Sequence, residues 1–342
     1  MHNKTMAYQP DIDSFFHTRS LTPKFIEGAP SSWRVRARLA VRGTPGKAEI
    51  GLFKPGSHEV LDRDTYPDHH PALDGALSAL REQINQLEIC PYSETTLQGD
   101  LRYIQLTASP ASNKVEIALV ANGKQPLPRL KKLAPDHSLW INIQEGSTNT
   151  IFGTNWHHIH GDKWLYQQLL QREIAFHPGA FIQSNLALFE KIIQAIKERS
   201  LPDKKVLELY AGVGAIGLNL DAPHVTMVEI NPLAHASYHQ TIQQIAEKER
   251  YTHLIAPAAL LDTPELLIVD PPRKGCDQEL LKEIAASSTL EQLLYVSCNF
   301  ATLRRDVEFL EKSGWKIQWA ETYDLFPGTG HFEYLLDLRR SG

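Results

Sequence analysis

Cysteine is scarce in this sequence, with three residues (Cys90, Cys276 and Cys298) in 342. Three thiols cannot build a disulfide framework, a four-cysteine metal site or an iron–sulfur site. We therefore expect no metal centre, and a reducing, cytoplasmic environment. Long hydrophobic runs are missing too, because no stretch approaches the roughly 18 apolar residues of a membrane helix. Residues 1–16 lack the apolar core of a signal peptide, so we expect no membrane association.

An excess of positive charge is also absent, since the formal net charge is -5 and the pI is about 6.3. This balance argues against a general polyanion-binding protein, which is usually strongly basic. It leaves RNA open as a partner, because a local basic face acts even when the average charge is negative. The length of 342 residues predicts two domains rather than one core.

The pattern of apolar residues divides the chain into three segments. Residues 1–30 contain three prolines and little periodicity, which predicts an irregular N-terminal arm. Residues 31–165 combine short strands with an amphipathic helix at 71–88, which is typical of an α+β domain. In residues 166–342 apolar strands alternate with helices. We expect there an α/β domain with a mixed, mostly parallel, Rossmann-like sheet.

Two basic segments lie in the expected α+β domain, residues 31–165. Arg34, Arg36, Arg38 and Arg42 alternate with apolar residues, so they would share one exposed face of a strand. A solvated strand face and a phosphate-binding face are both consistent with this row, because four like charges in line repel each other. A second basic stretch, residues 124–132, contains four Lys or Arg residues and no acid.

A glycine turn follows the first strand of the second domain. Tyr210 and Gly212 come directly after an apolar strand at 205–209, and Glu229 ends the next strand. A tight turn that lets a nucleoside approach the backbone, followed by an acid that accepts hydrogen bonds from ribose, is typical of an adenosine-containing cofactor site. A plain turn with a solvated glutamate is the simpler alternative.

Three further residues stand where strands are expected to end or begin. Asp270 precedes two prolines, which rigidly terminate the strand. Cys298 lies between a strand and a helix, where helix amides favour the thiolate; Cys90 and Cys276 are interpreted as buried apolar residues. Glu333 and His331 would share one face of the last strand, and this spacing alone favours an ordinary polar strand face.

Taken in order, these motifs resemble those of the RNA uracil-5 methyltransferases that modify tRNA and ribosomal RNA. The resemblance runs through the C-terminal half and, more weakly, through the central domain from Trp33. It is carried by residues 181–185, 206–214, 270–275, 297–299 with 302–306, and 326–327 with 331–333.

This resemblance implies a role for each matching residue. Cys298 matches the nucleophile and Glu333 the general base. Four other positions match residues that line the cofactor and target-base pocket: Gln183, Tyr210, Glu229 and Asp270. Gly212 belongs to the cofactor turn.

The implied activity is transfer of a methyl group from S-adenosylmethionine to carbon 5 of a uridine in structured RNA, by way of a covalent cysteine–carbon 6 adduct. Residues 31–165 would bind the RNA, and no obligate protein partner is evident. The family usually has Asn at position 215 and Pro at position 300, where this chain has Ala215 and Phe300.

These departures leave a second hypothesis, an RNA-binding protein with a degenerate methyltransferase fold. A third is methylation of another base or a small molecule. Arg273 argues against amino-nitrogen methylation, since an aromatic residue usually stands there to stack the base.

Overall fold

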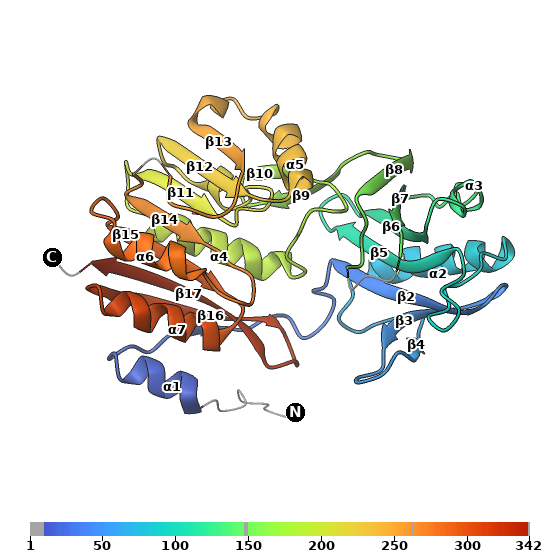
Figure 1. The fold of residues 1–342 in the computed structure, drawn as a ribbon, viewed down its shortest axis with the longest axis horizontal. Coiled ribbons are helices and arrows are strands. Elements are labelled where there is room, and N and C mark those ends of the chain that lie inside the picture. The colour runs from blue at the N-terminus through green and yellow to red at the C-terminus, as the bar shows by residue number, and fades with distance from the viewer. Residues whose placement is uncertain (1–9, 147–149, 262, 341–342) are drawn as a thin grey trace. The chain divides into compact units, whose positions relative to one another are not determined.

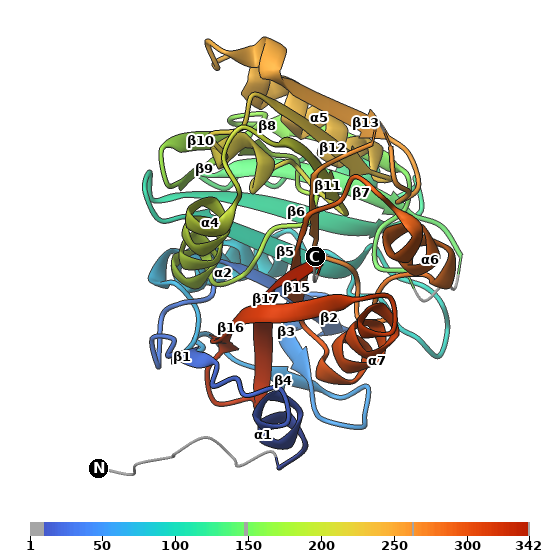
Figure 2. The same cartoon turned by 90° about the vertical axis from the view of Figure 1, so that its left-hand side faces the viewer.

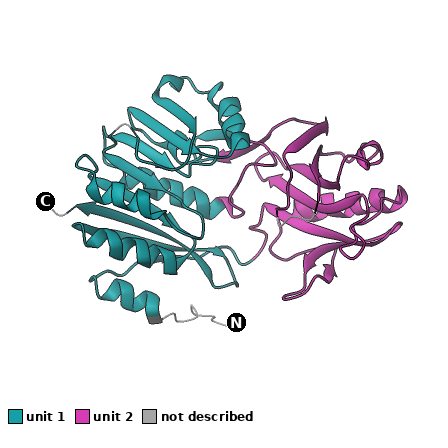
Figure 3. Ribbon diagram, in the orientation of Figure 1, with its two compact units in different colours: residues 1–30, 169–174, 187–342 teal, residues 31–168, 175–186 magenta. Residues whose placement is uncertain are grey.

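The computed structural model describes residues 10–146, 150–261 and 263–340. The chain forms two compact units (Figure 3). Unit 1 contains the N-terminal residues to Pro30, residues 169–174 and the chain from Ala187 onward, and unit 2 contains residues 31–168 and 175–186. The sequence predicted boundaries at residues 30/31 and 165/166; in the structure the chain passes between the units at residues 30/31, 168/169, 174/175 and 186/187.

Unit 1 is built on an eight-stranded sheet in the order β1-β16-β17-β15-β14-β11-β12-β13 (Figure 1). Strand β17 runs antiparallel to both neighbours and the other pairs are parallel, which confirms the predicted mixed, mostly parallel sheet. The strands are β1 (Lys24–Ile26), β11 (Lys205–Leu209), β12 (His224–Glu229), β13 (Tyr251–Ile255), β14 (Leu266–Val269), β15 (Gln292–Ser297), β16 (Trp315–Phe326) and β17 (His331–Arg340).

Helices cover both faces of this sheet, as apolar strands buried on both sides require. Helix α4 lies on one face, and α6 and α7 lie on the other (Figure 2). The second face forms a core in which Leu280 and Ile284 of α6 and Leu303 and Val307 of α7 pack against the strands. The helices of this unit are α1 (Pro10–His17), α4 (Leu186–Arg199), α5 (Pro232–Ile242), α6 (Gln278–Ala286) and α7 (Phe300–Glu311), with short 3₁₀ turns at Gly217–Asn219 and Lys248–Arg250.

The N-terminal arm is not irregular in its described part, residues 10–30. Strand β1 pairs in parallel with β16 at the edge of the sheet. The ring of Phe15 in α1 meets the ring of Phe300 edge-on at 5.3 Å. Just after α1, the Arg19 guanidinium donates two hydrogen bonds to Glu311, at 2.6 and 2.7 Å. Local periodicity predicted this segment wrongly because its partners lie about three hundred residues further along the chain.

Unit 2 contains a seven-stranded sheet in the order β4-β3-β2-β5-β6-β7-β8. Helix α2 (Pro71–Gln86) packs its buried residues Leu73, Leu77, Leu80 and Ile84 on one face, close to the predicted span of 71–88. The strands are β2 (Arg36–Thr44), β3 (Lys47–Phe53), β4 (Val60–Asp62), β5 (Leu101–Ser109), β6 (Lys114–Asn122), β7 (Ser138–Gln144) and β8 (Asn155–His160); α3 (Leu127–Leu130) is short, and β9 (Leu165–Leu169) pairs with β10 (Arg172–Phe176).

The predicted row of exposed arginines on β2 is wrong at Arg36. This side chain is 6% exposed, and it donates hydrogen bonds to the Thr107 hydroxyl at 3.0 Å and to the Ala180 carbonyl at 2.6 Å. The segment 175–186 returns over this face of the sheet, far from β2 in sequence. Arg38 remains exposed and donates to Gln105 at 2.7 Å.

None of the helices in the described part of the chain is both long enough and apolar enough to cross a membrane.

Candidate active site

The chemically distinctive residues of unit 1 meet at one edge of its sheet. Asp270 directly follows β14 and Cys298 directly follows β15, and these two strands are parallel neighbours. Glu333 lies near the start of β17, which pairs with β15 in the opposite direction, so that Ser297 stands opposite Tyr334. Because β17 is reversed, its beginning meets the ends of the parallel strands, and three strands deliver one acid or thiol each to the same place.

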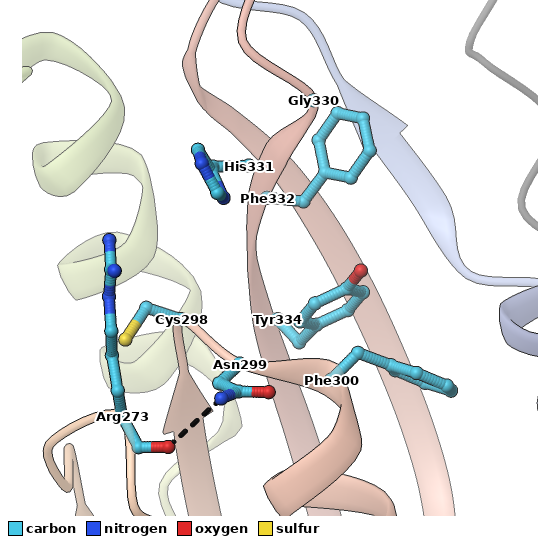
Figure 4. Close-up of a pocket in the computed structure, with 8 residues that line it drawn as sticks. All are labelled: Arg273, Cys298, Asn299, Phe300, Gly330, His331, Phe332 and Tyr334. Carbon is cyan, nitrogen blue, oxygen red and sulfur yellow. Dashed lines mark hydrogen bonds between the residues drawn. The ribbon is translucent and has the colours of Figure 1, made fainter. Parts of the chain in front are cut away.

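A cavity of about 250 Å³ opens beside the thiol of Cys298 (Figure 4). The sulfur points towards the side chain of Arg273, and His331 and Phe332 lie across the cavity. The lining residues are Arg273, Cys298, Asn299, Phe300, Gly330, His331, Phe332 and Tyr334. The volume is close to the ~300 Å³ at the lower end of ligand pockets, which suits one flat ring better than an extended molecule.

Burial raises the pKa values of the carboxyl groups at this edge of the sheet. Glu333 is 2% exposed, and its Oε1 has no hydrogen-bond partner among the described residues. Burial raises the pKa of Glu333 well above its ordinary value, and Asp270 adds to this. Burial also raises the pKa of Asp270, to about 7. Both carboxyls can therefore carry a proton near neutral pH.

The expected stabilisation of the Cys298 thiolate is not observed. Burial raises the pKa of this thiol, and the carboxyl groups of Glu333 and Asp270 raise it further, against the opposing effect of Arg273. The position before a helix start was predicted correctly, since α7 begins at Phe300. The predicted direction of the pKa was wrong because the thiol is partly buried and because two carboxyl groups from other strands raise its pKa further.

The loop that carries Arg273 is fastened to the start of α7. The Asn299 side-chain amide and the Thr302 hydroxyl both donate to the Arg273 carbonyl, at 3.0 and 3.2 Å. The amide of Cys276 donates to the buried carboxylate of Asp306 at 2.8 Å. Asn299, Thr302 and Asp306 all belong to the motif at residues 297–299 and 302–306. Their spacing of three and four, which places polar groups on one helix face, was a signal of this role.

The glycine turn has the features of a nucleoside site. Tyr210 and Gly212 have φ angles of +61° and +55°, and a Cβ atom at position 212 would meet nothing within 4 Å. The two oxygens of Glu229 accept from the amides of Gly212 at 3.0 Å and Asn231 at 2.8 Å. Each oxygen retains a lone pair for a ribose hydroxyl. Ile230, 67% exposed, offers an apolar surface beside them.

The hydroxyl of Tyr210 is buried and has no hydrogen-bond partner among the described residues. An aromatic residue at positive φ is strained, and such strain persists where the surroundings enforce it. The turn therefore offers an unpaired hydroxyl and an open side at Gly212, both compatible with a bound nucleoside. The structure thus brings four predicted cofactor residues, Tyr210, Gly212, Glu229 and Asp270, to the carboxyl ends of adjacent strands.

Gln183 lies in unit 2, where it is 8% exposed, and its cofactor role remains a prediction. The departure at Phe300 has a structural explanation. Its ring packs against Phe15 of α1, and at 5.5 Å against Tyr334 of β17. An aromatic residue at this position lets the N-terminal helix pack beside the Cys298 loop. Ala215 is buried, and nothing in the structure explains its presence.

Within the described ranges, no group of three or more His, Cys, Asp or Glu residues is arranged to hold a metal ion.

Residues 213–341 match the family model described as tRNA (Uracil-5-)-methyltransferase. An uncharacterized RNA methyltransferase of Protochlamydia amoebophila is 36% identical over 346 residues, which cover 95% of this chain and 90% of that protein. The chain belongs to the RNA uracil-5 methyltransferase family.

Other relatives agree with this assignment. An uncharacterized RNA methyltransferase of Listeria innocua is 30% identical, over 90% of this chain and 72% of that protein. The fold matches the Pyrococcus abyssi tRNA (uracil-54, C5)-methyltransferase in complex with S-adenosyl-L-homocysteine, with a TM-score of 0.79, 21% identity, and coverage of 95% and 81% of the two chains. The resemblance seen in the motifs is confirmed, and the chain is an S-adenosylmethionine-dependent RNA methyltransferase.

Proposed function

We propose that this methyltransferase modifies carbon 5 of a uridine in structured RNA through a temporary bond between Cys298 and carbon 6. One observation carries this proposal: Cys298, Asp270 and Glu333 lie on neighbouring strands at one edge of the sheet, where Cys298 lines a ring-sized cavity. S-adenosylmethionine, held at the turn of Gly212 and Glu229, supplies an electrophilic methyl group. The remaining steps belong to the side chains of the protein.

In the first step the sulfur of Cys298 adds to carbon 6 of the uracil ring. The thiol must lose its proton, and Asp270, with a pKa raised by burial to about 7, is suited to receive it. Addition moves an electron pair towards carbon 5 and oxygen 4, so that carbon 5 becomes nucleophilic enough to be methylated. An unmodified uracil ring lacks this reactivity.

In the last step Glu333 removes the proton from carbon 5. The electron pair of that C–H bond forms the double bond between carbons 5 and 6, and the bond to sulfur breaks, which returns Cys298 as a thiolate. The raised pKa of Glu333 makes its ionised form a strong base. Its unpaired Oε1 leaves one oxygen for the ring proton.

We propose that unit 2 binds the RNA, and that the target base is flipped out of its stack to reach the cavity. Lys124, Arg129, Lys131 and Lys132 are all exposed around the short helix α3. Arg129 also pairs with Asp100 at 3.1 Å. Such a cluster suits phosphate contacts. Nucleoside mass spectrometry of tRNA and rRNA from cells lacking the gene would assign the substrate, through loss of 5-methyluridine from one class.

The mechanism is tested with a stem-loop RNA that contains 5-fluorouracil. A base cannot remove fluorine from carbon 5 in the way that it removes a proton. The enzyme, S-adenosylmethionine and this RNA should therefore form a stable covalent complex. We expect this adduct with the wild type and with Cys276→Ser, the matched control, but not with Cys298→Ser. An adduct that survives Cys298→Ser would refute the proposal. Failure of the wild type to bind S-adenosylhomocysteine would instead favour the RNA-binding protein with a degenerate fold.

A further inference from the structure

Three histidines of unit 1 form a chain of hydrogen bonds that ends at the glycine turn. His239 and His235 lie one turn apart on α5, with their Nε2 atoms 2.8 Å apart. His235 Nδ1 lies 2.9 Å from Nδ1 of His253, which belongs to β13. His253 Nε2 lies 2.8 Å from the carbonyl oxygen of Gly212. The chain therefore runs from the exposed surface at His239 to the backbone of the turn.

The Gly212 carbonyl determines the direction of this chain, because a carbonyl oxygen can only accept a hydrogen bond. His253 must donate from Nε2, and its Nδ1 in the neutral ring must accept. His235 must then donate from Nδ1 and accept at Nε2. His239 must donate from Nε2. Each ring is held in one tautomer by the next, and an imidazole partner selects the tautomer in the same way as a carboxylate does in other sites.

We propose that His253 is a positioning residue for the nucleoside-binding turn, and that His235 and His239 hold it in the donating tautomer. This inference rests on the proposed cofactor site. The peptide groups of Gly212 are fixed on both sides, since its N–H donates to Glu229 and its carbonyl accepts from His253. A glycine at positive φ is otherwise free to move, so these two bonds fix the backbone on which the cofactor would lie.

The surroundings of His253 support a neutral, fixed ring. It is 5% exposed, and the ring of Tyr238 stacks on it at 4.8 Å with an angle of 26°. The titratable groups that face it are His235, His239 and Tyr238 of α5, with Tyr251 on its own strand. Burial lowers the pKa of His253 to about 4, and the two histidines contribute. The ring is therefore neutral at physiological pH, as the chain requires.

The test compares two substitutions of the same residue. His253→Phe keeps a ring against Tyr238 but removes the donor, whereas His253→Gln keeps an N–H donor in the place of Nε2. We expect His253→Phe to weaken S-adenosylhomocysteine binding, measured by calorimetry, about five- to tenfold, the effect of one neutral hydrogen bond. His253→Gln should bind within about twofold of the wild type. Equal binding by wild type and His253→Phe would overturn the proposal.

A second measurement keeps the test valid if His253→Phe fails to fold. In wild-type protein labelled with ¹⁵N in its histidine rings, long-range proton–nitrogen spectra report each tautomer. We expect His253 as the Nε2–H form and His235 as the Nδ1–H form; an Nδ1–H form of His253 would overturn the inference. Because this readout needs no ligand, it separates failure of the histidine chain from failure of the proposed function, which wild-type ligand binding tests.

Discussion

Both units bury charged side chains against a sheet, but they stabilise them in different ways. In unit 2, the positive charge of Arg36 lowers the pKa of the buried Glu116 but opposes burial only in part, and burial raises that pKa to about 8. In unit 1, Asp270, Glu333 and Cys298 are all acids: Asp270 raises the pKa of Glu333, and both carboxyl groups raise the pKa of Cys298. A neighbouring cation favours the ionised form of a buried acid, whereas neighbouring acids favour the protonated form. The first arrangement is structural, and the second makes protons available for chemistry.

The largest effect that this comparison predicts is at Cys298. Removing the nucleophile, in Cys298→Ser, should lower methyl transfer by at least about 10³-fold, as loss of a covalent nucleophile does in other enzymes. Cys276 is the matched control, because burial raises the pKa of this thiol to about 12 and keeps it inert. Transfer of a labelled methyl group to RNA measures both variants. If Cys298→Ser retained turnover, Cys298 would not be the nucleophile, and its role would not differ from that of the buried Cys276.

A somewhat smaller loss is expected for Glu333→Gln, on the order of 10²- to 10⁴-fold, the range for a general base. Here the covalent complex should still form with ordinary uridine and then persist, because the carbon 5 proton cannot be removed. Denaturing gel electrophoresis of enzyme mixed with RNA would reveal the trapped species.

Glu208→Gln is the control for Glu333→Gln, since Glu208 is an equally buried acid on the same sheet. Its Oε2 accepts from the Gly217 amide at 2.8 Å, and a glutamine oxygen can replace it there. Retained turnover in Glu208→Gln, together with loss in Glu333→Gln, would assign the effect to the pocket. Similar losses in both variants would indicate a general effect of buried carboxyl groups.

In unit 2 the corresponding change should affect stability instead. Arg36→Met removes the cation that opposes the raised pKa of Glu116 and leaves the buried Ala180 carbonyl without its donor, which should cost about 1–3 kcal/mol of unfolding free energy. Arg38→Met, at an exposed position on the same face of the strand, should cost less than about 1 kcal/mol. Adding Glu116→Gln to Arg36→Met should recover much of the loss. Denaturant unfolding measures all three, and equal costs at Arg36 and Arg38 would contradict the structural role of the pair.

Sequence reasoning succeeded where the signal was local and failed where distant segments meet. Strand ends placed Asp270 and Cys298 correctly, because a strand followed by prolines or by a helix start is visible in a few residues. It could not show that Glu333 would lie beside them, since this depends on β17 running against β15. The raised pKa of Cys298 was missed for that reason. Arg36 was misplaced because its cover comes from residues 175–186.

The smallest expected effect is a dependence of stability on pH. Burial raises the folded-state pKa of Glu333 above its ordinary value of 4.5, so the folded protein binds this proton more tightly than the unfolded chain. The stability contributed by Glu333 is therefore complete below about pH 4.5 and is lost as pH rises through the folded pKa. Glutamine cannot ionise, so the unfolding free energy of Glu333→Gln relative to wild type should increase from pH 5 to pH 8.

Arg36→Met should show the opposite trend. The unpaired Glu116 can remain protonated at pH 5, but at pH 8 the tendency to ionise makes its burial more costly, so the loss of stability relative to wild type should grow with pH. Denaturant unfolding at both pH values gives the two differences. If they changed in the same direction, acids in both units would respond to burial alone, and the contrast between acids beside other acids and an acid beside a cation would not hold.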